Sequence, residues 1–356
     1  MRVLHIVSAM GPGGIENLVF SLLRADEKNI FVLAINGTLE QTLKAWPALT
    51  SYKDQLIFAN KKEGLSFEIV RTIKKACHDH SIDIIHSHHI GPLIYGSLAS
   101  WGVRSPKHVH TQHDIWHLEQ RREWWIEYLI LNMRKDISLI AVSKKIFNYM
   151  KKLFPRNTIN LVHNGIDTDR FKPGNKNEAK ELLHLPMDST IIANASRLEE
   201  IKGLHYLIQA MQFLPESYHV AVAGNGSQLE TLKKNAASLG LSNRIHFLGH
   251  IDAIELLYQA SDLFCLPSLE EGLPLAILEA QACNLPVICS DVGSCAEGVD
   301  PESGFLIAPK DPKLIAQTCK KAIKTGSSSR DFILAHFSLS SLIEKYQHIY
   351  TRCAQP

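Results

Sequence analysis

No run of this sequence reaches the ~20 consecutive apolar residues that a membrane-spanning helix needs. The first apolar segment, residues 3–7, is too short for the core of a signal peptide, and the Gly-Pro-Gly-Gly sequence that follows it is no cleavage site. Low-complexity tracts and a clear internal repeat are also missing. We therefore expect a cytoplasmic protein that is either soluble or peripheral at the inner face of a membrane.

The seven cysteines show no sign of a disulfide framework. Their number is odd, no two have C-x-x-C spacing, and several lie in apolar stretches. Disulfides persist in oxidising compartments, whereas this pattern is typical of reduced thiols that fill a core. We therefore expect structural cysteines in a reducing compartment.

The net charge of +2 gives no strong excess of either sign, and no nucleic-acid recognition motif is present, so we expect no nucleic-acid partner. The charge is unevenly distributed. Residues 1–166 contain 21 Lys and Arg against 14 Asp and Glu, and the remainder contains 17 against 22. A basic front half suits contact with an anionic membrane surface or an acidic acceptor, and ordinary surface scatter is the competing interpretation.

The length of 356 residues and the hydrophobic content of 45% predict two domains with packed cores. Short apolar strands alternate with helical spacing along the whole chain, which favours α/β domains with parallel sheets covered by helices. The loop-like stretch 172–180 marks the boundary between the halves. Expected strands are residues 3–7, 31–35, 56–58, 83–86, 107–111, 138–142 and 160–162, then 190–193, 219–223, 245–248, 262–266 and 286–290.

A glycine-rich turn at residues 11–14 joins the first expected strand to a helix at residues 17–24. Glycine lets backbone N–H groups at a helix start approach an anion closely. The turn is not a dinucleotide fingerprint, because G-x-G-x-x-G is absent and no acidic residue ends the second strand. These absences argue against a nicotinamide enzyme. A plain strand-to-helix turn is the alternative to an anion site.

Six histidines cluster at or near two expected strand ends. Their H-x-H spacing can ligate zinc, but no cysteine or carboxylate set nearby completes a site. The ends of parallel strands are where α/β domains gather ligand-binding side chains, so we expect these residues to line a polar site and expect no metal. The six are His86, His88, His89, His108, His110 and His113.

The segment 118–134 combines aromatic side chains, among them Trp124 and Trp125, with basic ones on an expected amphipathic helix. That pattern is typical of an anchor at a membrane interface. A helix that packs against its own sheet has the same pattern. Both interpretations stay open.

The stretch 268–280 follows a buried strand and carries two widely spaced glutamates. Pro274 stands where a helix would begin, since its missing N–H costs nothing at the first helical position. Glu271 then lies just before the helix, and Glu279 projects from its second turn on the face that carries Leu275. The N–H groups at such a helix start suit a phosphate. A capping carboxylate and a solvated helix glutamate are the alternative.

The phrase EGLPLAILEA in this stretch resembles the E-x7-E signature of the retaining, nucleotide-sugar-dependent glycosyltransferases of family four, which have the GT-B fold. The resemblance implies two doubly wound Rossmann-like domains facing across a cleft. Residues 1–166 would form the N-terminal, acceptor-side domain, joined by a C-terminal helix within residues 338–356 that crosses back. Residues 167–337 would form the nucleotide-sugar-binding domain.

By the same resemblance, Glu279 would hold the ribose hydroxyls of the donor and Glu271 would lie beside the sugar. The backbone of Gly272, Leu273 and Pro274 would approach the sugar and the diphosphate. These roles rest on the family likeness.

A second likeness is the R-x4-K-G sequence that begins at Arg197. A leaving nucleoside diphosphate gains charge as the sugar bond breaks, and Arg197 offers a bidentate fork where Lys202 offers a compact cation. These cations would stabilise the leaving phosphate in place of a metal, so we expect no metal cofactor. Two unrelated surface cations are the alternative. Ser196 stands where the family often has glycine.

Shorter motifs extend the resemblance over the chain. Thr111–Asp114 matches a strand-end H-D motif whose histidine would reach the donor sugar, and the backbone near His250 would meet the nucleotide base. The remaining donor-side candidates are Gly13 and Gly14 of the first turn and Asn225 and Gly226 of a G-x-G turn, and the acceptor-side candidates are Glu16 and Asp114.

The resemblance therefore implies transfer of a hexose-type sugar from a UDP- or GDP-sugar to a hydroxyl of a glycan or lipid-linked acceptor, with retained configuration. The expected catalytic set is His113, Glu271, Arg197 and Lys202, and the expected context is bacterial cell-surface polysaccharide or lipopolysaccharide synthesis. The alternatives are a non-catalytic GT-B member of a polysaccharide assembly and a sugar-nucleotide epimerase. Sugar, base, acceptor, linkage and oligomeric state do not follow from the sequence.

Overall fold

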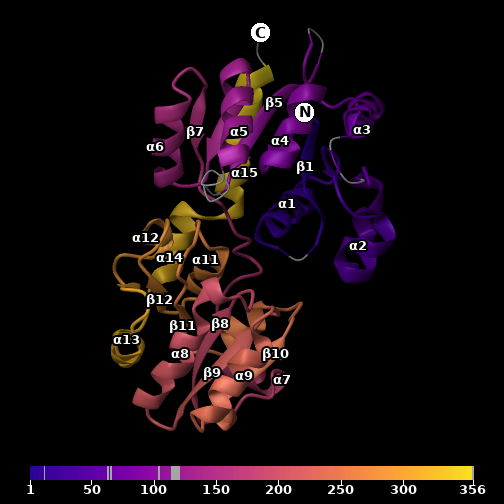
Figure 1. Ribbon diagram of the computed structural model, residues 1–356. Coiled ribbons are helices and arrows are strands. Elements are labelled where there is room, and N and C mark those ends of the chain that lie inside the picture. Colours follow the sequence, from indigo (N-terminus) through magenta and orange to yellow (C-terminus); the bar gives the residue numbers. More distant parts are fainter. Residues whose placement is uncertain (12, 62–63, 65, 103–104, 114–120, 355–356) are drawn as a thin grey trace. The chain divides into compact units, whose positions relative to one another are not determined.

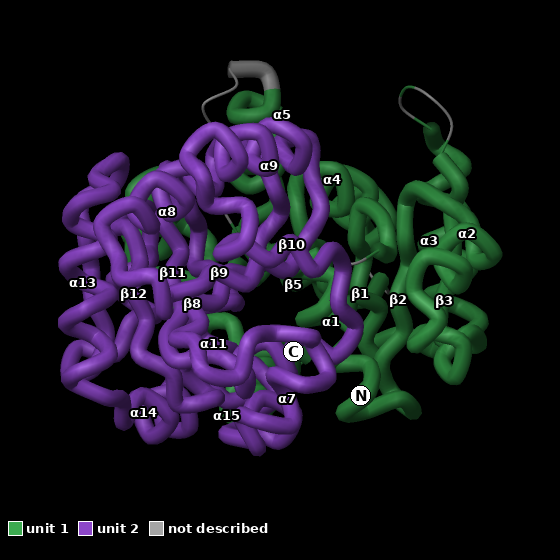
Figure 2. The backbone as a smooth tube through the Cα atoms, turned by 90° about the horizontal axis from the view of Figure 1, so that it is seen from below, with its two compact units in different colours: residues 1–165, 339–356 green, residues 166–338 purple. Residues whose placement is uncertain are grey.

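The computed structural model describes residues 1–11, 13–61, 64, 66–102, 105–113 and 121–354. The chain divides into two compact units, drawn in green and purple in Figure 2. Unit 1 comprises Met1–Gly165 with Leu339–Pro356, and unit 2 comprises Ile166–Ser338. Within the described residues, no helix is both long enough and apolar enough to cross a bilayer.

Unit 1 is built on a parallel sheet, in which the described residues form seven strands in the order β3-β2-β1-β4-β5-β6-β7. Strand β1, labelled in Figure 1, pairs with β2 on one side and with β4 on the other, so the chain reverses its winding direction between β1 and β4. The strands are β1 (Val3–Val7), β2 (Ile30–Ala34), β3 (Leu56–Phe58), β4 (Ile84–His88), β5 (Lys107–Gln112), β6 (Ser138–Ala141) and β7 (Ile159–Leu161).

Helices cover both faces of this sheet, because alternate side chains of its central strands are apolar and buried on each side. One apolar cluster joins Leu4, Ile6 and Ile85 to the helices α3 and α4, and clusters on the other face involve α1, α2 and α15. The helices are α1 (Gly14–Ala25), α2 (Leu39–Ala45), η1 (Pro47–Gln55), α3 (Phe67–Asp79), α4 (Ile90–Ala99), α5 (Arg121–Met133), α6 (Lys144–Leu153) and α15 (Leu339–Ala354).

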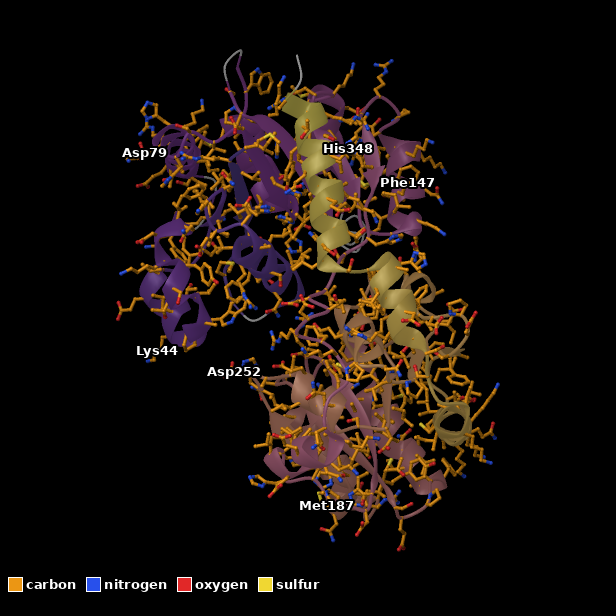
Figure 3. All side chains as sticks on the ribbon, turned by 180° about the vertical axis from the view of Figure 1, so that it is seen from behind. Lys44, Asp79, Phe147, Met187, Asp252 and His348 are labelled. Atoms are coloured by element: carbon orange, nitrogen blue, oxygen red, sulfur yellow. The ribbon has the colours of Figure 1, made fainter. Side chains whose placement is uncertain are left out.

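The C-terminal helix α15 packs on the sheet of unit 1, although the whole of unit 2 precedes it in the sequence. Its buried residues Leu342, Tyr346 and Tyr350 share one apolar cluster with Val3 and Ile84. Figure 3 draws α15 in yellow along this unit, with His348 labelled on it. The chain therefore closes unit 1 only after unit 2 has been completed.

Unit 2 repeats the architecture with a parallel sheet, for which the described residues give six strands in the order β10-β9-β8-β11-β12-β13. Its winding direction reverses between β8 and β11. The strands are β8 (Thr190–Ala195), β9 (Tyr218–Ala223), β10 (Ile245–Gly249), β11 (Leu263–Leu266), β12 (Val287–Ser290) and β13 (Phe305–Ile307). The helices are α7 (Lys176–Leu182), η3 (Glu200–Lys202), α8 (Leu204–Ala210), η4 (Met211–Phe213), α9 (Leu229–Ser238), η5 (Ser242–Arg244), α10 (Glu255–Gln259), α11 (Leu275–Ala282), α12 (Cys295–Gly298), α13 (Pro312–Thr325) and α14 (Ser329–His336).

The predicted fold class, two doubly wound α/β domains, is confirmed. Helix α1 begins at Gly14 rather than at residue 17, because Gly13 has extended backbone angles and serves as the N-cap. The helices α2 and η1 were not expected from the sequence. All seven cysteines lie in the described part of the chain and are free thiols.

Unit 1 contains four buried histidines whose pKa values are lowered. His5, His86 and His88 lie on one face of the sheet and His108 on the other, and all four are almost completely buried. Burial lowers the pKa of His5 to about 3, and it lowers the pKa of the other three well below the ordinary value. These imidazoles are therefore neutral at physiological pH.

We expect unit 1 to lose stability as the pH falls below about 6.5, the unfolded pKa of histidine. Because the folded pKa values are depressed, the unfolded chain binds more protons in this range, and each such histidine removes about 1.4 kcal/mol of unfolding free energy per pH unit. All five tryptophans lie in residues 1–165, so urea unfolding followed by tryptophan fluorescence between pH 7 and pH 5 measures this unit. The variant His108→Gln should show a shallower slope, and an unfolding free energy that stays flat over this range would contradict the expectation.

Candidate functional site

The site predicted in unit 2 lies at the carboxyl edge of its sheet, where the winding direction reverses. Strands β8 and β11 are neighbours, yet their outgoing loops lead to elements on opposite sides. Such a reversal opens a space at the strand ends, which is where doubly wound sheets bind ligands. The loop after β8 carries the R-x4-K sequence, and the loop after β11 carries Glu271.

Lys202 and Glu271 meet at this point. The ammonium Nζ of Lys202 donates to the carboxylate Oε1 of Glu271 over 2.7 Å, and the hydroxyl of Ser268 donates to the same oxygen over 2.7 Å. The side chain of Lys202 is 14% exposed and that of Glu271 is 5% exposed. A charge this well removed from water needs both an opposite charge and hydrogen bonds, and Glu271 has both.

Gly203 explains how the two loops come so close. It has a positive φ of 62°, and a Cβ at this position would collide with the carbonyl oxygen of Pro267. The backbone N–H of Leu269 donates to the carbonyl of Ile201 over 2.7 Å and ties the loops together. The glycine of the R-x4-K-G sequence therefore lets the β8 loop lie directly on the β11 loop.

A third loop, after β12, supports Glu271 from the other side. Gly293 has a positive φ of 60°, and a Cβ there would overlap the carbonyl oxygen of Glu271. The N–H of Ser294 donates to the carbonyl of Gly272 over 3.0 Å. The backbone of the Glu271-Gly272 turn is thus fixed by neighbours on two strands.

The G-x-G turn after β9 packs on the β8 loop in the same manner. Leu198 donates its N–H to the carbonyl of Asn225 over 2.9 Å, and a Cβ at Gly226 would collide with the backbone of Leu198. The Glu199 carboxylate accepts from the hydroxyl of Ser227 over 2.6 Å. Asn225 and Gly226 therefore hold the loop that carries Arg197.

Arg197 differs from Lys202 in its surroundings. Its side chain is exposed, whereas that of Lys202 is mostly covered and bonded to Glu271. A guanidinium in this position can turn toward an anion without leaving a buried partner behind.

Glu279 projects from helix α11, as predicted, and its carboxylate Oε2 accepts from the hydroxyl of Tyr258 over 2.6 Å. Burial raises the pKa of Glu279, and the Tyr258 hydrogen bond and the charge of Arg170 oppose that rise. A carboxylate held in this way suits hydrogen bonding to hydroxyl groups, because Tyr258 fixes its orientation.

The start of helix α11 differs from the prediction. Pro274 has extended backbone angles and is the N-cap, so the first helical residue is Leu275. Proline gives no side-chain cap, and Gly272 and Leu273 form the approach to the helix start. The remaining donor-side candidate of unit 2, His250, lies exposed after β10, with its Nε2 atom 3.3 Å from a carboxylate oxygen of Asp252.

The candidates of unit 1 lie after β1 and β5. The carboxylate of Glu16 lies against Gly13, where a side chain would collide with it, and Gly14 begins helix α1. His113 follows the end of β5 and is buried, with its Nε2 atom 2.9 Å from Nδ1 of His88. Asp114 lies outside the described residues.

Sequence reasoning did not find the residues that hold the candidates in place. Ser268, Tyr258 and Asn194 had no motif to mark them, yet the buried Asn194 amide donates to the carbonyl of Cys265 over 2.8 Å and links β8 to β11. Among the described residues, His5, His86 and His88 are the one group of potential metal ligands whose ring nitrogens lie within 4.8 Å of one another. Both ring nitrogens of His86 are already hydrogen bonded, to Tyr350 and to Thr111.

Two family models match the chain in succession. Residues 12–170 match the model described as Glycosyltransferase Family 4, and residues 175–335 match Glycosyl transferases group 1. The junction between the two matches falls near the boundary of the two units.

Relatives and solved structures agree with these matches. The chain is 30% identical over 297 residues to the UDP-Gal:alpha-D-GlcNAc-diphosphoundecaprenol alpha-1,3-galactosyltransferase of Escherichia coli, covering 75% of each chain. It is 29% identical over 352 residues to D-inositol 3-phosphate glycosyltransferase 2 of Catenulispora acidiphila, covering 87% of this chain and 81% of the relative. The structure of Anabaena Alr3699/HepE in complex with UDP superposes with a TM-score of 0.85 at 21% identity, over 99% and 100% of the two chains. The chain therefore belongs to the glycosyltransferases of the GT-B type, with a family 4 domain followed by a group 1 domain.

Proposed function

We propose that this glycosyltransferase moves a hexose-type sugar from a UDP- or GDP-sugar to a hydroxyl of a glycan or lipid-linked acceptor, with retained configuration, in bacterial cell-surface polysaccharide synthesis. The observation that carries the proposal is the meeting of Lys202 and Glu271 at the winding reversal of unit 2, where Lys202 lies on the loop that also carries Arg197. The galactosyltransferase relative is named for UDP-Gal, and a HepE structure holds UDP-glucose.

The leaving nucleoside diphosphate would be stabilised by two cations of unit 2. Lysine has three N–H donors, and Glu271 takes one from Lys202, so the ammonium can also donate to phosphate oxygens. Arg197 can add a bidentate fork from the same loop. Interactions that strengthen as charge develops on the leaving group lower the barrier to sugar transfer.

The other candidates would hold the rest of the donor. Glu279, oriented by Tyr258, would bind the ribose hydroxyls, and Glu271 and His113 would orient the sugar. The acceptor hydroxyl would attack from the face of the leaving group, with the leaving phosphate taking its proton. We further propose that no metal takes part, since the two cations would supply the charge that a divalent ion provides in other transferases.

Arg197 gives the cleanest test of the phosphate role. It is exposed, so Arg197→Ala should leave the melting temperature unchanged, while the affinity for UDP or GDP falls about tenfold and turnover falls about 100-fold. The measurements are calorimetric titration with UDP and GDP and release of nucleoside diphosphate from the sugar nucleotides. Lys320→Ala, at an exposed cation on α13, is the matched control and should behave like the wild type.

Lys202→Ala should act differently from Arg197→Ala. Removing the ammonium leaves the Glu271 carboxylate buried without its opposite charge, which costs on the order of 3–5 kcal/mol of stability.

Equal nucleotide affinity in the wild type and in Arg197→Ala would contradict the phosphate role of this loop.

The metal proposal has its own test. Turnover in about 5 mM EDTA should stay within about twofold of turnover without EDTA, because side chains supply the charge stabilisation. Loss of turnover that Mg²⁺ or Mn²⁺ restores would contradict the proposal that no metal takes part. The proposed diphosphate contacts would still stand.

A membrane surface is the partner that we propose for unit 1. Trp125, Leu129 and Met133 are 53%, 54% and 68% exposed and recur at intervals of four residues, so they form one apolar stripe on α5. The opposite side of α5 packs inward through Leu131, which is fully buried. One face of α5 thus packs on its own sheet, and the exposed stripe on the other supports the membrane proposal.

Helix α6, which carries Lys144, Lys145, Lys151 and Lys152, packs with α5. Tyr128 of α5 and Phe154 at the end of α6 have ring centroids 6.1 Å apart, and both helices pack on the same apolar cluster. Residues 134–166 contain a single acidic residue, Asp136. Arg134 is buried and pairs with Asp136, and the other basic residues are Lys135, Lys144, Lys145, Lys151, Lys152 and Arg156. An apolar ridge next to a basic stretch of chain suits an anionic bilayer, where each cation near the surface adds about 1 kcal/mol.

The double variant Trp125→Ser/Leu129→Ser should bind vesicles containing anionic phospholipid at least tenfold more weakly than the wild type in a sedimentation assay. The cause is the loss of two buried apolar side chains at the bilayer, each worth roughly 1.5–3 kcal/mol when fully buried. Phe67→Ser removes another exposed aromatic of unit 1, which is 78% exposed, and should leave binding unchanged. Equal binding by all three proteins, or binding to neutral vesicles only, would contradict the membrane proposal.

A further inference from the structure

Helix α10 connects two parts of the candidate nucleotide site of unit 2. It begins at Glu255, shortly after the loop that contains His250. One turn later, the hydroxyl of the fully buried Tyr258 donates to Oε2 of Glu279 on α11 over 2.6 Å. The short helix therefore joins the loop proposed to meet the base to the carboxylate proposed to hold the ribose.

Arg170 fixes the start of α10. Its Nε atom donates to a carboxylate oxygen of Glu255 over 2.9 Å, and its Nη2 atom donates to the backbone carbonyl of Asp252 over 2.7 Å. The guanidinium lies 5.1 Å from the ring centroid of Phe171, and that ring packs edge-on against Tyr258 with centroids 6.0 Å apart. Arg170, Phe171, Glu255 and Tyr258, which we call the α10 cluster, are therefore in contact from the loop after β10 to the tyrosine hydroxyl.

The segment that carries Arg170 is itself held in place within unit 2. The carboxylate of Asp167 accepts from the backbone N–H of Arg170 over 3.0 Å. The guanidinium of Arg330 donates to the carbonyls of Thr168 and Phe171 over 3.0 Å and 2.8 Å. Because the backbone on both sides of Arg170 is fixed, its planar fork reaches Glu255 and Asp252 at little further entropic cost.

The Glu279 carboxylate has one oxygen in use and capacity left for a ligand. Among the residues that the structure describes, its one hydrogen bond comes from Tyr258, at Oε2, and its side chain is only partly buried. A carboxylate offers about four acceptor positions, so Oε1 can accept from hydroxyl groups. The bond from Tyr258 fixes the carboxylate before a ligand arrives, which lowers the cost of binding.

We propose that Tyr258 and Arg170 are positioning residues for the nucleoside end of the donor. Tyr258 holds the Glu279 carboxylate so that Oε1 is presented to the ribose hydroxyls, and Arg170 holds the backbone of the loop after β10 where the base would lie. The proposal rests on the proposed function, because it takes this edge of the sheet as the nucleotide site. It adds that the preference for ribose over deoxyribose depends on a buried tyrosine that does not touch the ligand.

The variant Tyr258→Phe keeps the ring and removes the hydroxyl. Calorimetric titration with UDP and 2′-deoxy-UDP, and with the matching guanine pair, measures the preference for ribose. We expect the wild type to bind the ribonucleotide about tenfold more tightly than the deoxynucleotide, and Tyr258→Phe to bind it at most about threefold more tightly. The two losses are not additive, because the ribose hydroxyl and the tyrosine act on the same carboxylate.

Two controls separate positioning from a general loosening of the core. Inorganic pyrophosphate has no ribose and would contact only Arg197 and Lys202, so the wild type and Tyr258→Phe should bind it equally. Tyr218→Phe, at the amino end of β9 and on the edge of the sheet opposite the candidate site, should keep the ribose preference of the wild type. A ribose preference that is unchanged in Tyr258→Phe, or a parallel loss of pyrophosphate affinity, would overturn the role of Tyr258.

The role of Arg170 is tested by two substitutions. Arg170→Gln removes both the charge and the fork, and Arg170→Lys keeps the charge but cannot bridge Glu255 and the carbonyl of Asp252 in the same plane. We expect nucleotide affinity to fall about tenfold in Arg170→Gln and by a smaller factor in Arg170→Lys, with pyrophosphate affinity unchanged in both. Lys176→Gln, which breaks the ion pair with Asp262 in the same unit, should bind nucleotide like the wild type. Wild-type nucleotide affinity in Arg170→Gln would refute the role of Arg170.

The pH profile of the ribose preference gives a second readout. The ionisable groups that face Glu279 are Arg170, Glu255 and Tyr258 together with Cys283 at the end of its own helix. Burial raises the pKa of Glu279, and the Tyr258 hydrogen bond and the charge of Arg170 lower it. Loss of the tyrosine hydroxyl should therefore raise this pKa further, so that the preference disappears at a higher pH in Tyr258→Phe than in the wild type as the pH falls. Coincident profiles would count against the positioning role.

The two proposals fail in different ways. If the wild type binds neither nucleotide nor pyrophosphate, the proposed function fails and the positioning role fails with it. If the wild type binds UDP or GDP with no preference for ribose, or if Tyr258→Phe keeps that preference, the positioning role of Tyr258 alone is refuted and the proposed function stands.

Discussion

The ion pair between Lys202 and Glu271 is the contact on which the candidate site of unit 2 depends. Two buried charges repay their desolvation only when geometry and additional hydrogen bonds are good, so such a pair contributes little net stability over an apolar pair. Here the hydroxyl of Ser268 completes the coordination of Glu271, and Gly203 allows the close approach of the two loops. The pair orders a cation at the winding reversal of the sheet, where, under the proposed function, a phosphate would share its donors without first organising the loops.

Unit 1 applies a related constraint with neutral groups. Its sheet also reverses its winding direction, between β1 and β4, and polar side chains again gather at the strand ends. Burial keeps these imidazoles uncharged, so hydrogen bonds rather than ion pairs fix their orientation. Helix α15 covers these buried histidines, and the hydroxyl of Tyr350 on this helix forms a hydrogen bond with Nδ1 of His86.

The fold and the motif positions could be predicted from the sequence, because strand and helix periodicity and the spacing of Arg197, Lys202, Glu271 and Glu279 are local features. The supporting contacts could not. Asn194, Tyr258 and Ser268 act through partners that are distant in sequence or unmarked by any motif. The buried histidines of β1 and β4 become neighbours only once the strand order is known. The exposed stripe of α5 was ambiguous for the same reason, since only packing decides which face of an amphipathic helix turns inward.

We propose that the loops after β8 and β11 form a diphosphate site, and a crystal structure of the protein with UDP or GDP would test this. We expect phosphate oxygens within hydrogen-bond distance of the Arg197 guanidinium and the Lys202 ammonium, with the ribose hydroxyls on the Glu279 carboxylate. A nucleotide bound elsewhere in the chain, with those three side chains facing solvent, would contradict it.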